Sequence, residues 1–336
     1  MLPRSTQGES GTGGQLATIP QEPTPVPSSI LQAKYTKVRK GERSVYWMMV
    51  PALLLLLVLV ALPFLLSVYT SLTRLNQYTI TDWLRAPFIG IDNYITAIRQ
   101  GNALGASALQ SVFVSVAFSI GTTVLLTPIG IIAALLVNKP FTGRRWIRAL
   151  FLLPYITPVF VNAITWRLLF MTKWGLIDRT LGFLHIASKQ TLWLIGPHSF
   201  WAMVIADVWA SWPFLYLMVL AGLQGISDEL YQSAFIDGAS RVRSFFSITL
   251  PMLRPILGLA LLLSTLNHFN NFTLPFMMFG TPPSPSADVL PLNVYVTSFQ
   301  TFNFGLGSAM SIITLILMMI PAFFYIRMLR LGEESA

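Results

Sequence analysis

The residues of this chain with the most chemical potential are polar side chains inside otherwise apolar stretches. They form two sets, each spaced i, i+4, i+7: Asp207, Ser211 and Phe214, and then Ser264, His268 and Asn271. This spacing places each set on one face of an α-helix. Trp209 and Trp212 flank the first set with aromatic rings. Together the two sets offer hydrogen-bond donors, acceptors and aromatic faces.

Such groups suit a solute that carries hydroxyl groups. Two facing stripes would form a hydrated cavity in which polar side chains pair with hydroxyl groups and aromatic rings cover C–H surface. Ionisable groups inside apolar helices are costly, and by default they indicate a pathway or a site. The alternative is that these groups only hold helices together by hydrogen bonds. Asp207 has a further alternative as the buried partner of Arg167.

The elements that carry these residues are predicted to be membrane-spanning helices. Hydrophobic residues make up 54% of the 336 residues and charged residues only 10%, whereas a soluble domain has about 25% charged residues. A bilayer core about 30 Å thick requires roughly 20 apolar residues per helix. Six ranges meet this requirement: 45–70, 108–137, 146–171, 199–223, 252–279 and 305–325. The predicted fold class is therefore an all-α integral membrane protein with six transmembrane helices.

The positions of Lys and Arg orient these spans. Most of them fall on the N-terminal side of the membrane, in the segments 34–43, 139–148, 241–254 and 327–330. Because positive residues favour the cytoplasmic side, both termini are expected there. The net charge of +9 then reflects topology, and no nucleic-acid partner is expected.

The two ends of the chain are expected to lie outside the membrane domain. Residues 1–44 are rich in Gly, Pro, Ser and Thr, which predicts a disordered cytoplasmic tail. The basic run Lys34–Arg43 sets the topology or, alternatively, binds anionic membrane lipid. Residues 331–336 are expected to form a second short tail. Between these tails, residues 45–330 form the predicted transmembrane domain.

Two outer segments carry weaker signals. Apolar residues between Phe88 and Ile98 are spaced for a short helix at the membrane interface. Between Thr281 and Pro291 several prolines exclude a regular helix and predict an extended, exposed loop. His185 and His198, also in an outer loop, are too isolated for a metal site.

The loop 226–251, between the fourth and fifth spans, carries the strongest local signal. Ser227 is a candidate N-cap with two acidic residues after it, and Gly238 is placed to end that helix with a positive φ. A second short helix is expected from about Ser240 to Pro251, where the chain turns into the fifth span. The loop is thus predicted to be a helix–glycine–helix hairpin on the cytoplasmic face.

At these residues the chain resembles the inner-membrane permease subunits of binding-protein-dependent ABC importers. Their loop signature is Glu-Ala-Ala, three residues, Gly, and about nine residues later Ile-x-Leu-Pro. This chain has Gln232-Ser233-Ala234, Gly238 and Ile248-Thr249-Leu250-Pro251 at matching spacing, and it departs from the signature at Gln232 and Ser233. The resemblance spans roughly residues 45–330. It is strongest to the maltose-type carbohydrate-uptake class, supported by Asn270-Asn271-Phe272, Phe88–Tyr94 and Leu153-Pro154.

The resemblance implies a type I ABC importer fold, in which this loop is a coupling helix that inserts into a cytoplasmic ATPase. The residues it assigns to that contact are Glu229, Gln232, Ala234, Asp237 and Gly238. It also assigns substrate contacts to the two stripes: Asp207, Ser211, Phe214, Ser264, His268 and Asn271.

The implied partners are a second homologous permease, two ATPase subunits and an extracytoplasmic solute-binding protein, in a bacterial or archaeal inner membrane. This chain has no G-x-x-x-x-G-K-[ST] motif. ATP and Mg are therefore expected in the partner ATPases, with no cofactor, metal or catalytic residue in this chain.

The predicted function is one permease half of an ATP-driven importer for a sugar, of di- or oligosaccharide size. One alternative is an ion-coupled secondary transporter in which Asp207 and His268 relay protons. Such folds commonly contain internal repeats, and none is evident in this sequence. Another alternative is the same importer class carrying glycerol phosphate or a polyol.

Overall fold

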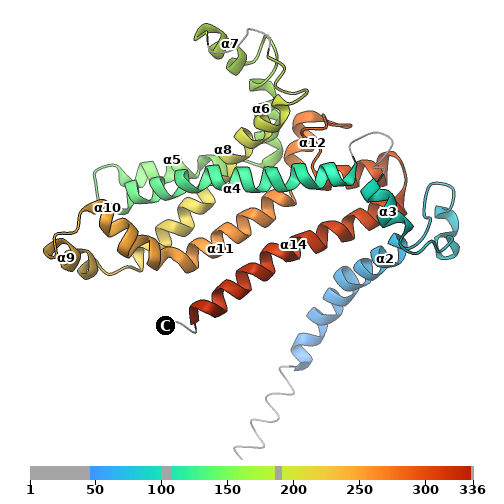
Figure 1. Cartoon of the computed structure of the whole chain (residues 1–336), viewed down its shortest axis with the longest axis horizontal. Coiled ribbons are helices and arrows are strands. Elements are labelled where there is room, and N and C mark those ends of the chain that lie inside the picture. Colours follow the sequence, from blue (N-terminus) through green and yellow to red (C-terminus); the bar gives the residue numbers. More distant parts are fainter. Residues whose placement is uncertain (1–45, 100–106, 186–190, 334–336) are drawn as a thin grey trace, which may run out of the picture. The chain divides into compact units, whose positions relative to one another are not determined.

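The computed structural model describes residues 46–99, 107–185 and 191–333, and Figure 1 shows these residues as an assembly of helices. The chain divides into two units, Met1–Leu62 and Pro63–Ala336. In the first unit the described residues form one exposed apolar helix that includes the π-helical turn η1 (Leu57–Ala61). The expectations for the tail 1–44 and for the basic run Lys34–Arg43 lie outside the described residues.

The long helices coincide with the ranges expected from hydropathy. Among the described residues, five helices are long and apolar enough to cross a membrane: Tyr46–Ser71, Ala108–Asn138, His198–Gln224, Arg241–Phe269 and Phe304–Arg327. The first of them includes α2 (Leu62–Ser71), and the next two are α4 (Ala108–Asn138) and α8 (His198–Gln224). The last belongs to α14 (Phe304–Glu333), which continues into the predicted tail 331–336. A bent pair of helices supplies the sixth candidate span.

The third predicted span, 146–171, is broken rather than straight. It consists of α5 (Arg144–Ile156) and α6 (Val159–Leu169), bent by 88°. Pro158 explains the break, since proline disfavours the helical conformation of the residue before it and has no N–H to donate. Thr157 is accordingly extended, with ψ 125°.

The fifth predicted span, 252–279, has different boundaries in the structure. The helix starts at Arg241 and runs through α10 (Arg241–Ser244), the π-helical turn η3 (Phe245–Thr249) and α11 (Leu250–Phe269). The predicted turn at Pro251 is wrong: the π-helical turn lets the Leu250 N–H donate to the Phe245 carbonyl, so the helix continues past the proline. At the other end α11 stops at Phe269, and α12 (Thr273–Phe279) is a separate helix.

The outer segments are more structured than predicted. The expected interfacial helix is α3 (Asp92–Arg99), preceded by the 3₁₀ helix η2 (Ile80–Arg85). The loop after α12 is exposed at Pro282 and Pro285, and its end, Ala287–Leu290, is buried. It leads into α13 (Leu290–Tyr295) and the π-helical turn η4 (Val296–Gln300), neither of which was expected from the sequence. A short helix, α7 (Leu176–Phe183), follows α6.

The core that positions the site is formed by α4, α8 and α11. A cluster of buried residues joins all three helices, and it includes the small residues Ala133, Ala134 and Ala260. Small side chains let helix axes approach closely, as is common in membrane proteins. Figure 1 shows α4, α8 and α11 side by side, with α9 (Asp228–Ile236) at one end of this group.

Candidate functional site

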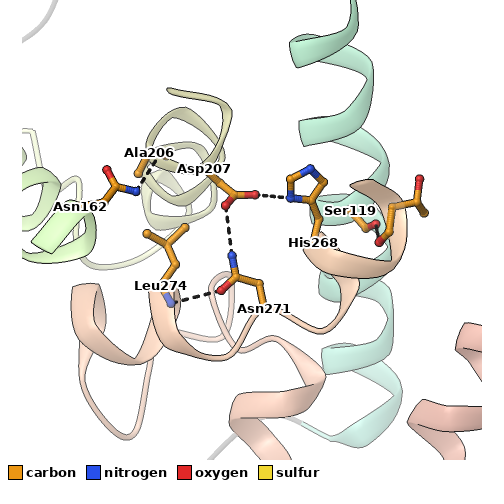
Figure 2. Close-up of polar contacts among 8 residues, drawn as sticks. Ser119, Asn162, Ala206, Asp207, His268, Asn271 and Leu274 are labelled. Atoms are coloured by element: carbon orange, nitrogen blue, oxygen red, sulfur yellow. Dashed lines mark hydrogen bonds and ion pairs between the residues drawn. The ribbon is translucent and has the colours of Figure 1, made fainter. Parts of the chain in front are cut away.

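Three polar residues meet where α8 faces the end of α11 (Figure 2). His268 Nδ1 lies 2.6 Å from Asp207 Oδ2. Asn271 Nδ2 donates a hydrogen bond of 3.1 Å to Asp207 Oδ1. Each oxygen of the Asp207 carboxylate therefore contacts one polar group, and both of these groups belong to the stripe formed by Ser264, His268 and Asn271. The structure thus brings together half of the six residues assigned to the substrate.

Two members of this trio are deeply buried, and Asn271 is half-buried. The side chains of His268 and Asp207 are 4% and 7% exposed. The alternative partner Arg167 points elsewhere, since its guanidinium donates to the Met277 carbonyl at 3.4 Å. A buried carboxylate requires a hydrogen-bonding or cationic partner. For Asp207 that partner is His268, and the alternative pairing with Arg167 is not found.

Asn271 connects the trio to the break between α11 and α12. Its side-chain oxygen accepts a hydrogen bond of 3.2 Å from the Leu274 N–H in the first turn of α12. Pro275 follows in that turn, where a missing N–H costs little. The break places the Asn271 side chain between α12 and α8. Its oxygen caps α12, and its nitrogen binds Asp207 on α8.

The remaining predicted site residues lie on the same helices and do not join the trio. Ser264 is buried one helical turn before His268. Ser211 is half-buried one turn after Asp207. Phe214 packs against α5 instead, where its ring stacks with Tyr155 at a centroid distance of 6.4 Å. The aromatic end of the first stripe therefore contacts the third predicted span.

A stripe of hydroxyl groups on α4 was missed in the sequence, because Ser and Thr are common in membrane helices and stand out less than ionisable residues. The stripe consists of Ser111, Ser115, Ser119, Thr122 and Thr123, all buried. Ser119 donates to the Thr265 carbonyl of α11 at 2.6 Å. The hydroxyl groups of Thr122 and Thr123 have no hydrogen-bond partner among the described residues. The regular spacing of three to four residues was the available signal.

A further buried carboxylate lies in the loop after α12, which was predicted to be exposed. Asp288 is 1% exposed. Its Oδ2 accepts hydrogen bonds from Asn293 Nδ2 at 2.7 Å and from Ser111 Oγ at 3.3 Å. The predicted exposed loop is wrong at Asp288, because the folding of α13 against α4 cannot be read from proline content.

The hairpin in the loop 226–251 has the predicted local geometry. The Ser227 side chain accepts a hydrogen bond from the Glu229 N–H, and α9 spans Asp228–Ile236. Gly238 has φ +76°, a left-handed conformation that favours glycine. The Ala239 N–H donates to the Ala234 carbonyl at 2.9 Å, as in a helix-terminating Schellman motif.

The outer face of α9 is open and apolar. Phe235 and Ile236 are 80% and 83% exposed. Of the residues assigned to ATPase contact, Ala234 is half-buried, whereas the others are exposed: Glu229, Gln232, Asp237 and Gly238. Gln232, Phe235 and Ile236 also line a shallow depression on this helix. Exposed aromatic and aliphatic groups of this kind are typical of a surface that binds another protein.

Residues 126–331 match the family described as "Binding-protein-dependent transport system inner membrane component". The chain belongs to this family. It is therefore a multi-pass protein of the inner membrane, and it is a transport subunit rather than an enzyme. Membership also favours binding-protein-dependent import over ion-coupled secondary transport.

Relatives of known description extend over most of the chain. The trehalose/maltose transport system permease protein MalF of Thermococcus litoralis is 35% identical over 305 residues, which cover 90% of this chain and 97% of the relative. The sulfoquinovosyl glycerol transport system permease protein SmoG of Agrobacterium fabrum is 30% identical, with 84% and 89% covered.

The fold is also found among solved structures. A permease chain in the crystal structure of a bacterial ABC transporter that imports the acidic polysaccharide alginate superposes with a TM-score of 0.73. The match covers 88% of this chain and 98% of that chain, at 18% sequence identity. This likeness shows the type I importer fold that the sequence predicted.

Proposed function

We propose that this permease is one half of the translocation pathway of an ATP-driven importer for a di- or oligosaccharide. The observation that carries the proposal is the 35% identity, over nearly the full length of both chains, with a trehalose/maltose permease. The sugar would bind between α8 and α11, near the residues assigned from the sequence: Asp207, Ser211, Phe214, Ser264, His268 and Asn271.

The charges near this region favour a neutral sugar over glycerol phosphate. Among α4, α8, α11 and α12, the one Lys or Arg is Arg254. It lies fourteen residues before His268, about 21 Å along the helix. A phosphate in this region would meet the Asp207 carboxylate, and like charges in a site of low dielectric repel strongly. The guanidinium of Arg167 on α6 is already bound to the Met277 carbonyl.

The proposed partners follow from the same assignment. A second permease would complete the pathway, and an extracytoplasmic binding protein would deliver the sugar. Two ATPases, which would bind ATP and Mg, would contact α9 on the cytoplasmic side. Both termini would face the cytoplasm. ATP-driven closure would move α9, and the movement would pass through the helix Arg241–Phe269 to the sugar region.

The proposal is tested by reconstitution in proteoliposomes. The permease would be purified with the partner permease, ATPases and binding protein encoded beside it, and uptake of radiolabelled trehalose, maltose, glycerol 3-phosphate and sorbitol would be measured. We expect uptake of a disaccharide that requires both ATP and the binding protein. Uptake of only glycerol 3-phosphate or sorbitol would overturn the sugar assignment. Transport by this chain alone without ATP would overturn the importer assignment.

A further inference from the structure

Both oxygens of the Asp207 carboxylate lie close to polar groups of this chain. Asn271 Nδ2 occupies one oxygen at 3.1 Å, and His268 Nδ1 occupies the other at 2.6 Å. With 7% of its side chain exposed, Asp207 has little surface left for a solute. A direct contact between Asp207 and a sugar would require both of these interactions to be replaced.

One of the two imidazole nitrogens of His268, Nε2, does not contact Asp207. Nδ1 faces a carboxylate oxygen at 2.6 Å, an arrangement that favours a proton on Nδ1. Nε2 is buried and has no hydrogen-bond partner among the described residues. In Figure 2 this second nitrogen points away from Asp207 and Asn271. A buried polar atom without a partner is unfavourable, and such an atom in a native protein calls for an explanation.

The surroundings explain why Nε2 is available only to a ligand. The ring of Phe118 on α4 meets the His268 ring edge-on at a centroid distance of 6.4 Å and offers no hydrogen-bonding group. Ser119, the next residue on α4, is already bound to the Thr265 carbonyl. The residues around the His268 ring on α4 therefore leave Nε2 without a hydrogen-bond partner.

We propose, on the basis of the sugar assignment above, that Asp207 is a positioning residue that does not touch the sugar. Asp207 holds His268 in the tautomer with a proton on Nδ1, and His268 Nε2 accepts a hydrogen bond from a sugar hydroxyl group. A carboxylate commonly orients a histidine in this way, because the bond at one nitrogen determines the state of the other. The Asp207–His268 pair then selects a hydroxyl donor at one position of the sugar.

The tautomer can be measured without any sugar. The chain contains 3 histidines, so ¹⁵N-histidine labelling of the full-length protein in nanodiscs gives three pairs of ring-nitrogen signals, and His268→Gln identifies the pair from His268. We expect a protonated Nδ1 and an unprotonated Nε2. In Asp207→Asn the amide nitrogen takes the place of Oδ2 and donates to Nδ1, so the proton should move to Nε2. A wild-type ring protonated at Nε2 alone, or no change in Asp207→Asn, would overturn the proposal.

The transport arm uses maltose and its monodeoxy analogues in the reconstituted importer. Asp207→Asn should raise the KM for maltose about tenfold with kcat nearly unchanged, and so should His268→Phe, because each removes the acceptor. In the double variant the KM should match that of His268→Phe alone, since Asp207 acts through His268. Effects that multiply would mean that Asp207 binds the sugar itself, and an unchanged KM in His268→Phe would remove Nε2 from the site.

The ¹⁵N measurement and the transport measurement distinguish a failure of the sugar assignment from a failure of the positioning role of Asp207. If wild-type importer takes up no sugar while the ¹⁵N signals show the expected tautomers, the sugar assignment fails and the positioning role of Asp207 stands. If maltose is transported and the double variant shows multiplied effects, the sugar assignment stands and the positioning role fails.

Discussion

The hydroxyl groups of Tyr231 and Thr249 lie 2.9 Å apart. Tyr231 belongs to α9, and Thr249 is the last residue of the π-helical turn η3. This hydrogen bond joins the exposed helix proposed to contact the ATPase to the base of the helix that ends at Phe269, just after His268. A displacement of α9 can therefore pass into α11 through this side-chain pair as well as through the backbone.

Removing this link should weaken transport more than assembly. Tyr231→Phe deletes one hydrogen bond worth about 1 kcal/mol, and we expect about a fivefold fall in sugar uptake per ATP hydrolysed, with normal co-purification of the ATPase. Tyr78→Phe is the matched control, because Tyr78 is 81% exposed. Uptake and ATP hydrolysis by the two variants, measured in the same proteoliposomes, check the prediction. If the two variants show the same ratio of sugar uptake to ATP hydrolysis, the Tyr231–Thr249 hydrogen bond does not transmit the movement of α9.

Gly238 should tolerate asparagine better than valine. Its φ of +76° costs a side chain about 1–2 kcal/mol, and a β-branched residue more, whereas asparagine enters this region comparatively readily. We expect Gly238→Val to abolish co-purification with the ATPase and Gly238→Asn to retain most of it. Pull-down from detergent-solubilised membranes provides the measurement. Equal capture by both variants would contradict the role of this turn.

Gly305 should not accept even a methyl group. A Cβ at this position would lie 2.4 Å from the Thr73 carbonyl oxygen, and backbone cannot yield as a flexible side chain can. Overpacking of this kind costs about 1–3 kcal/mol, so Gly305→Ala should lower the thermal unfolding midpoint by about 5 °C. Gly121→Ala is the control and should not lower the midpoint, because a Cβ there would meet no atom within 4 Å. A matching decrease in both variants would count against the close approach.

The bond between Asn271 and Asp207 should fail when both residues are acidic. Asn271→Asp keeps an acceptor for the Leu274 N–H but places a second carboxylate beside Asp207 Oδ1. Because one of the two buried charges would lack a partner, we expect a loss of about 3 kcal/mol in stability. The exchange variant Asp207→Asn with Asn271→Asp restores one donor and one acceptor and should recover much of it. The thermal unfolding midpoints of the single variant and the exchange variant check this prediction. If the exchange variant recovers no stability, the two side chains are not in direct contact.

Local signals predicted much of the architecture because each depends on nearby residues alone. Uncharged stretches identified the helices near 108–137 and 199–223, which the structure extends by one residue or so at their ends. Ser227 and Gly238 predicted the limits of α9, since capping and positive φ are properties of a few consecutive residues. Pro158 was equally visible in the sequence, but the 88° direction change that follows it depends on how α6 packs.

By itself, the sequence determined where most of the long helices lie, where the hairpin in the loop 226–251 begins and turns, and which family the loop resembles. Only the tertiary structure decided the partners of the buried polar groups. Asp207 and His268 are 61 residues apart in the numbering, and nothing local distinguishes His268 from Arg167 as the partner of the carboxylate. The choice follows from the packing of α8 against α11, because the free energy of a buried charge depends on the groups that other helices bring within about 3 Å.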